Sequence, residues 1–231
     1  MNIEKPFRNR LHAGRQLARA LPADLHGRDA LVLALPRGGV PVGFVVAKEL
    51  ALELDILLVR KLGLPGHEEY AMGALGSGGV RVLQPEVVRS CGVTPAALEA
   101  ICAREQREIE RREQQYRGDY PAPTLQGRSV VLVDDGLATG ASMRAAIEVA
   151  RASAPARILV AVPVGAPDTC AALEPEVDAL VCLLRPPAFR AVSTWYQHFD
   201  QTSDEEVQDL LALARRKRAR PKEHVHARPI R

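Results

Sequence analysis

The stretch VVLVDDGLATGASM, residues 130–143, decides the fold. Apolar residues are followed by the carboxylates Asp134 and Asp135 and then by a turn rich in glycine, threonine and serine. A short run that is apolar throughout is typical of a strand covered on both faces, and the small residues after it can open a helix. Because ligands of α/β proteins bind where strands end and helices begin, this stretch also predicts a binding site.

The turn after the two aspartates predicts a site for an anion. Its residues would present backbone N–H groups and two hydroxyls at a helix N-terminus, where the helix dipole favours negative charge. The lysine of a P-loop is absent, which suits a phosphate that is held and not transferred. The residues expected to hold it are Ala138, Thr139, Gly140, Ala141 and Ser142.

Asp134 and Asp135 are not expected to bind the phosphate, because carboxylates repel it, so they are expected to bind another part of the ligand. Accepting hydrogen bonds from a vicinal diol, such as the two hydroxyls of a ribose, suits them. Phosphate and diol together indicate ribose 5-phosphate. The plain alternative is that both aspartates only end a strand and cap a turn.

Strand-like and helix-like segments alternate along the chain. Apolar runs predict strands at 30–35, 55–59, 130–134, 157–163 and 179–183. Helical patterns occupy 40–52, 95–117, 140–153 and 167–173, and Ser203 with Glu206 forms a capping box for a final helix. The alternation predicts an α/β fold, a Rossmann-like parallel sheet of about five strands flanked by helices. Residues 63–79 hold six glycines without clear periodicity, which predicts a flexible lid loop.

Composition excludes several classes of protein. With 47% hydrophobic and 26% charged residues the chain is globular, and no apolar stretch is long enough to span a membrane. No signal segment is readable, so we expect a cytoplasmic protein. The net charge of +3 is uneven, because residues 215–231 hold eight basic residues and one acidic residue, whereas the remainder is mildly acidic. The charge therefore gives little support for a nucleic-acid partner, and the basic tail at 215–231 is expected to be disordered.

Residues 130–143 closely resemble the 5-phosphoribosyl-1-diphosphate (PRPP) motif of the type I phosphoribosyltransferases. A second stretch, LALPRGGVPVG at 33–43, resembles the diphosphate-binding loop of that family, with Arg37, Gly38 and Gly39 as its binding residues. The resemblance predicts a cis peptide between Pro36 and Arg37. Taken alone, a glycine pair after a strand is as often only a tight turn.

Two further segments support the resemblance. Arg60 and Lys61, followed by the glycine-rich stretch, look like the basic pair and lid of orotate- and adenine-type members, although two solvated residues at a strand end would look the same. The resemblance also implies a hood over a base, with a stacking ring from Phe189, Trp195 or Tyr196; ordinary core packing is the alternative.

The resemblance implies four divisions of the chain. They are an N-terminal segment at 1–29, a phosphoribosyltransferase core at 30–184 with a helical insertion at 94–117, a hood and C-terminal helix at 185–214, and the basic tail.

The implied activity is transfer of the 5-phosphoribosyl group of PRPP to a purine or pyrimidine base, with release of diphosphate, as in nucleotide salvage. Catalysis would rest on Arg37, Arg60, Lys61, Asp134 and Asp135. The implied cofactor is Mg²⁺, carried by PRPP, with Asp134 or Asp135 as its only candidate protein ligands, through water. A homodimer is also implied.

The acceptor base stays open. Hypoxanthine- and guanine-type members carry an acid where this chain has Ala138, so adenine-, orotate- and uracil-like bases remain. A second hypothesis is a PRPP-sensing regulator without catalysis whose basic tail contacts RNA or DNA. A dinucleotide-dependent dehydrogenase is excluded, because the glycines at 38, 39 and 43 do not form GxGxxG.

Overall fold

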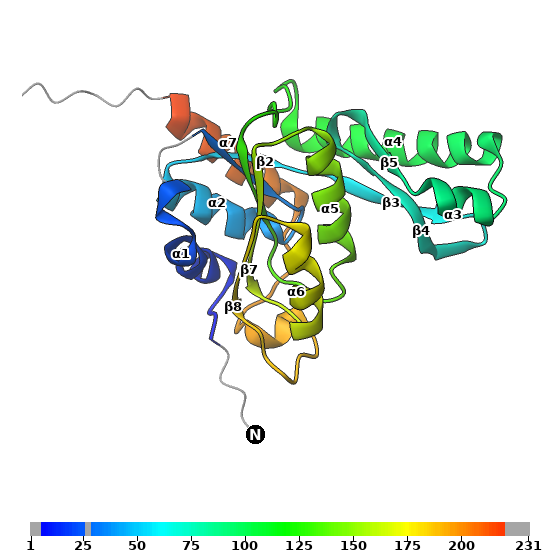
Figure 1. Cartoon of the computed structure of the whole chain (residues 1–231). Helices are drawn as coiled ribbons and strands as arrows, with labels where there is room; N and C mark the ends of the chain where they lie inside the picture. The colour runs from blue at the N-terminus through cyan, green and yellow to red at the C-terminus, as the bar shows by residue number, and fades with distance from the viewer. Residues whose placement is uncertain (1–5, 26–28, 220–231) are drawn as a thin grey trace, which may run out of the picture.

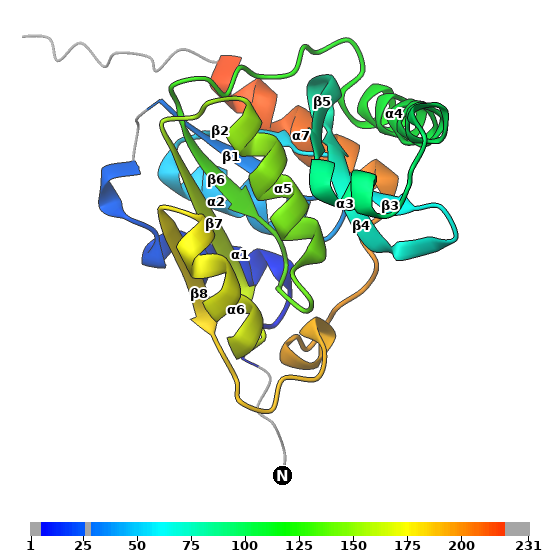
Figure 2. The same ribbon diagram turned by 45° about the vertical axis from the view of Figure 1, so that its right-hand side comes forward.

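The computed structural model describes residues 6–25 and 29–219, without the side chains of residues 68, 69 and 217–219. Its centre is a five-stranded parallel sheet with strand order β2-β1-β6-β7-β8 (Figures 1 and 2). This confirms the predicted fold class. The strands are β1 (Ala30–Ala34), β2 (Glu53–Ile56), β6 (Ser129–Val133), β7 (Arg157–Val164) and β8 (Ala179–Leu184).

Helices cover both faces of this sheet (Figure 2). Alternate residues of β1 point to opposite sides, so Val32 packs into one buried cluster and Leu33 into the other. One side carries α1 (Arg10–Ala20), α2 (Gly39–Leu50) and α7 (Asp204–Ala219), and the other carries α5 (Ala141–Ala152) and α6 (Pro167–Leu173). Short 3-10 turns lie at η1 (Ala23–Leu25), η2 (Ser77–Gly79), η3 (Glu174–Glu176) and η4 (Val192–Trp195).

The N-terminal helix belongs to the core. α1 lies against α2, and a Cβ at Gly14 would fall 2.8 Å from the carbonyl oxygen of Val42. Leu17 is fully buried in the same cluster as the sheet residues Val32 and Val131. The predicted division at residue 29 therefore marks no boundary in packing.

Residues 63–79 do not form the predicted loop, because they contribute to a second, antiparallel sheet of three strands; a lid role for this segment stays a prediction. The sheet consists of β3 (Val59–Leu64), β4 (His67–Gly76) and β5 (Val80–Leu83), so the predicted strand at 55–59 is also divided between two sheets. The glycines allow close packing here: a Cβ at Gly76 would lie 2.1 Å from the Val149 side chain, and one at Gly73 2.3 Å from a backbone oxygen. The hairpin packs against the core through side chains that are buried, which are Leu62, Leu64, Met72, Ala74 and Leu75.

The second sheet and two helices form an arm beside the main sheet (Figure 1). The helices are α3 (Pro85–Ser90) and α4 (Pro95–Arg117), and α4 contacts both β3 and α7. The Thr94 side chain accepts a hydrogen bond from the Ala97 N–H, which confirms the predicted start of this helix. At its other end, buried Arg117 pairs with Asp55 of β2, so α4 is fixed to the main sheet.

The predicted capping box at Ser203 is confirmed in part, since its hydroxyl accepts a hydrogen bond from the Glu206 N–H at 3.1 Å. α7 continues to Ala219, so the prediction of a disordered tail is wrong for residues 215–219. Acidic residues in the first turn favour this helix through its dipole. The rest of the tail, 220–231, lies outside the described residues. None of the helices within the described ranges has both the length and the apolar character to cross a membrane.

Candidate functional site

The candidate site lies where β1 and β6 end side by side. Ala34 and Val133 are paired in register, and the Leu35 N–H donates to the Val133 carbonyl, so the loops that follow the two strands meet. A Cβ at Gly38 would lie 2.1 Å from the Asp135 carboxylate, and one at Gly39 would lie 2.6 Å from the Val133 oxygen. Glycine is therefore required at both positions by the close approach of the two loops.

Asp134 faces a cavity of about 100 Å³ beside this junction. The cavity is also lined by Pro36 of the loop after β1 and by Arg60, Arg112 and Ser142, from three different elements. One carboxylate oxygen of Asp134 accepts the N–H of the next residue at 2.8 Å. Burial raises the pKa of Asp134 well above its usual range, and the neighbouring carboxylate raises it further. The cavity is small, so it can hold only part of a larger ligand.

Asp135 turns away to a basic residue that the sequence analysis missed. The Nε of Arg10, at the start of α1, donates to the Asp135 carboxylate at 2.8 Å. Arg10 also donates to the Asp200 carbonyl at 2.6 Å, and its guanidinium lies 3.9 Å from the centre of the Phe199 ring. Burial raises the pKa of Asp135, although the charge of Arg10 opposes this. Asp135 is thus anchored within the fold.

The predicted anion turn is open to solvent. Ala138, Thr139, Ala141 and Ser142 are exposed, whereas Gly140 is buried and adopts a φ of 74° immediately before α5. The first N–H groups of a helix have no partner within it, so the start of α5 can donate to an anion. The exposure of these four residues agrees with the proposed phosphate site.

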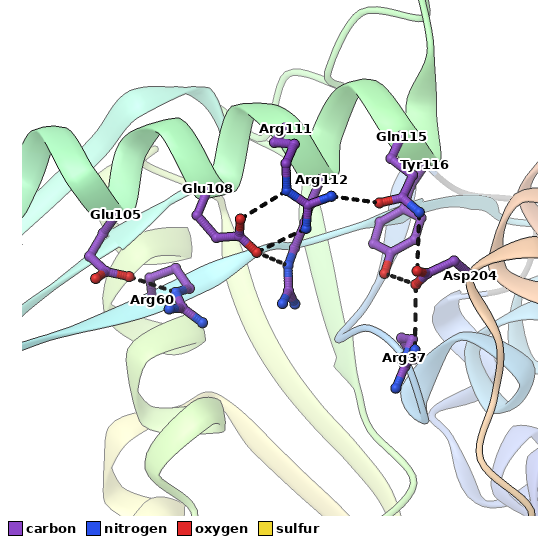
Figure 3. A network of polar contacts seen from close by, with 9 residues as sticks. All are labelled: Arg37, Arg60, Glu105, Glu108, Arg111, Arg112, Gln115, Tyr116 and Asp204. Atoms are coloured by element: carbon purple, nitrogen blue, oxygen red, sulfur yellow. Dashed lines mark hydrogen bonds and ion pairs between the residues drawn. The ribbon is translucent and has the colours of Figure 1, made fainter.

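The loop after β1 contains the predicted cis peptide between Pro36 and Arg37. The Gly39 N–H does not face a ligand, because it donates to the Leu35 carbonyl at 3.0 Å, so its predicted role as a diphosphate donor is corrected. The guanidinium of Arg37 is partly exposed and lies 3.6 Å from the Asp204 carboxylate at the start of α7 (Figure 3).

Arg60 and Lys61 are adjacent in β3 and so point to opposite faces of the hairpin. Arg60 lines the cavity and donates to Glu105 of α4 at 2.8 Å (Figure 3). Arg60 and Arg104 hold the pKa of Glu105 below its usual value despite its burial. Lys61 is exposed and does not line the cavity. The structure brings Arg37 and Arg60 to the site, but the two members of the predicted basic pair are separated.

Of the three predicted stacking rings, Tyr196 is placed in the core. It is 1% exposed, its ring packs against Phe7 and Phe199, and its hydroxyl donates to the Asp135 carbonyl at 2.7 Å. A ring so enclosed cannot stack on a ligand, so this assignment is corrected. Phe189 and Trp195 are half-buried beside the same cluster and keep an accessible edge.

Asp134 is the carboxylate that fits a divalent cation at this site. Mg²⁺ prefers oxygen ligands and keeps several waters, so one cavity-facing carboxylate and a ligand's phosphate oxygens suit it. Among the residues that the structure describes, no cluster of three or more metal-binding side chains is present. Any such ion would depend mainly on its ligand.

This geometry and the sequence match define the class: the chain belongs to the phosphoribosyl transferase domain family, whose sequence profile matches residues 6–192. Two relatives from Mycobacterium tuberculosis strains, both named "Putative phosphoribosyl transferase" (MT0597 and Rv0571c), are 47% identical over 212 residues. The match covers 92% of this chain and 48% of theirs, so the chain spans about half their length. The crystal structure of TT1426 from Thermus thermophilus is 45% identical with a TM-score of 0.81, covering 89% of this chain and 97% of that one.

Proposed function

We propose that this chain transfers the 5-phosphoribosyl group of PRPP to a nitrogenous base and releases diphosphate. The observation that carries the proposal is the junction of β1 and β6, where Asp134 faces a cavity beside an open helix N-terminus and an arginine-bearing loop. PRPP has a part for each of these features: ribose hydroxyls for Asp134, a 5-phosphate for the helix N-terminus and a diphosphate for the arginine-bearing loop.

In the proposed reaction the bond between C1 of the ribose and the diphosphate oxygen breaks, and a bond from a base nitrogen to C1 forms. The electron pair leaves with the diphosphate, and the base nitrogen loses its proton. Arg37 and Arg60 would stabilise the negative charge of the leaving diphosphate. Lys61 lies on the opposite face of β3, so it would reach the diphosphate only if this strand turned toward the cavity. Bound Mg²⁺ would supply further neutralisation of the diphosphate.

The remaining groups would hold the ribose in place. Asp134 would accept hydrogen bonds from the ribose hydroxyls, and the turn at 138–142 would bind the 5-phosphate through backbone N–H groups and the hydroxyls of Thr139 and Ser142. Positioning of both substrates removes much of the entropic cost of bringing them together. Asp135 would act on the ribose indirectly, because its bond to Arg10 fixes the end of β6 next to Asp134.

The base would lie toward residues 185–200, where Phe189 and Trp195 keep partial exposure. The indole N–H of Trp195 is buried and has no acceptor among the described residues. Because this N–H is enclosed, it does not distinguish among adenine-, orotate- and uracil-like acceptors.

The test is a turnover assay on the full chain with PRPP, Mg²⁺ and a panel of bases: adenine, hypoxanthine, guanine, uracil and orotate. We expect diphosphate release with at least one base, and Asp134→Asn should lower kcat/KM by about 100-fold through loss of a charge-assisted contact. Glu148→Gln, a change on the same side of the sheet but away from the cavity, is the matched control. PRPP binding without turnover on any base would refute the transferase and support the PRPP-sensing alternative.

A further inference from the structure

The surface of α4 that faces the main sheet carries a chain of polar contacts directly above the candidate site (Figure 3). Arg60 bonds to Glu105, Arg111 and Arg112 bond to Glu108, and Arg37 lies beside Asp204. Arg104 shares Glu105. Five guanidinium groups therefore share three carboxylates, which leaves this surface positive and suited to an anion.

Arg112 is, with Arg60, a member of this network that lines the cavity. Its side chain is 36% exposed and lines the cavity together with Asp134, Ser142 and Arg60. In Figure 3 the guanidinium extends from α4 past the carboxylate of Glu108. Its Nε donates to Glu108 at 2.7 Å, and its two terminal nitrogens have no hydrogen bond within the described part of the chain.

Glu108 does not depend on Arg112 for a partner. Arg111 donates to both oxygens of Glu108, at 2.9 and 3.1 Å, and together the two arginines lower the pKa of Glu108 to about 2. The carboxylate is thus ionised and fixed, and it can orient the Arg112 side chain through Nε. A guanidinium held at Nε presents two parallel N–H donors, the arrangement that matches phosphate oxygens.

We propose that Arg112 is a substrate-binding residue that contacts the diphosphate of PRPP, so that α4 forms one wall of the active site. This inference rests on the proposed function. The diphosphate is favoured over the 5-phosphate because Arg112 shares its cavity with Arg60 and with Pro36 of the loop after β1, whereas the 5-phosphate has the turn at 138–142. Asp134 and Ser142, the last residue of that turn, line the same cavity, so the ribose would lie beside Arg112 as well.

The test compares Arg112→Gln with Arg107→Gln, a change of another arginine on α4. Arg107 is exposed and does not line the cavity, which makes it the matched control. Titration calorimetry with PRPP and Mg²⁺ should show about 10- to 100-fold weaker binding for Arg112→Gln and less than about twofold change for Arg107→Gln. Arg112→Lys should recover part of the loss, because it restores the charge without the fork.

A second titration uses ribose 5-phosphate, which lacks the diphosphate. Arg112→Gln should bind it as the unaltered chain does, within about twofold. Equal weakening for both ligands would refute the assignment to the diphosphate, and equal PRPP affinity of the two glutamine variants would refute the role of Arg112 altogether. If the unaltered chain binds no PRPP, the proposed function fails, and titration with inorganic diphosphate still decides the role of Arg112. Melting curves identify misfolding, in which case Arg112→Lys replaces Arg112→Gln in both comparisons.

Discussion

Replacing Arg10 by glutamine should destabilise the protein strongly at neutral pH. The change removes the positive partner of Asp135, a carboxylate that is 15% exposed, and leaves its charge without compensation. Loss of one partner of a buried pair costs about 3–5 kcal/mol, and the remaining exposure of both side chains places this site near the lower value. The contact with the Phe199 ring adds about 0.5–1 kcal/mol, so we expect a loss of about 4 kcal/mol.

The loss should depend on pH in a direction that follows from Asp135. Its pKa is raised in the folded protein, so the ionised form is less favourable there than in the unfolded chain, and protonation stabilises the fold. Removing Arg10 raises this pKa further. The cost of Arg10→Gln should therefore be largest above the raised pKa and should decrease as the pH falls through it.

Urea unfolding at about pH 8 and about pH 5 measures this cost, and Asp135→Asn completes a double-mutant cycle. In the Asp135→Asn background, Arg10→Gln should cost only about 1–2 kcal/mol, since no charge is left unpaired. Because Asp135 raises and Arg10 lowers the pKa of Asp134, the cycle is repeated in an Asp134→Asn background, which removes that titration. An identical cost at both pH values and in both backgrounds would refute the reasoning.

Three other substitutions test the packing of the site. Gly38→Ala places a Cβ 2.1 Å from the Asp135 carboxylate, so it should lower the melting temperature by about 4 °C or more and weaken PRPP binding in calorimetry; an unchanged affinity would contradict the close approach of the two loops. Gly140→Ala combines a φ of 74° with a contact of 2.6 Å to Thr169 and should cost about 1–2 kcal/mol in urea unfolding; no loss would show that the turn can relax. Tyr196→Phe removes only the hydroxyl that bonds to the Asp135 carbonyl and should cost about 1 kcal/mol in the same assay, whereas a neutral result would show that this bond adds nothing.

The sequence predicted the main sheet well because its strands are covered on both faces and are therefore apolar throughout. The second sheet was missed because of Gly73 and Gly76 in β4. In the fold these glycines let neighbouring groups lie closer than a Cβ atom would permit. Without the neighbours, these glycines favour a loop. Only the tertiary structure explains them, because the Val149 side chain packs against Gly76 and the backbone of β5 lies against Gly73.

The candidate site divides in the same way. Asp134, Arg37 and the turn at 138–142 follow strands directly, so local order along the chain was enough to find them. Arg10 is 125 positions from Asp135, and nothing in the sequence of its helix distinguishes it from the other arginines there. Its role comes only from the packing of α1 beside the sheet, and the same is true of Arg112 in α4.

Asp134 and Asp135 were expected to share one task, but their surroundings separate them. Consecutive residues at the end of a strand point to opposite sides, so only one of the two can face the cavity. The other is held by Arg10 and by the backbone of the neighbouring loop. Pairing Asp135 in this way offsets part of the repulsion between two adjacent buried carboxylates. It therefore allows Asp134 to remain beside an open cavity, where a hydroxyl-bearing ligand can supply the hydrogen bonds that the protein does not.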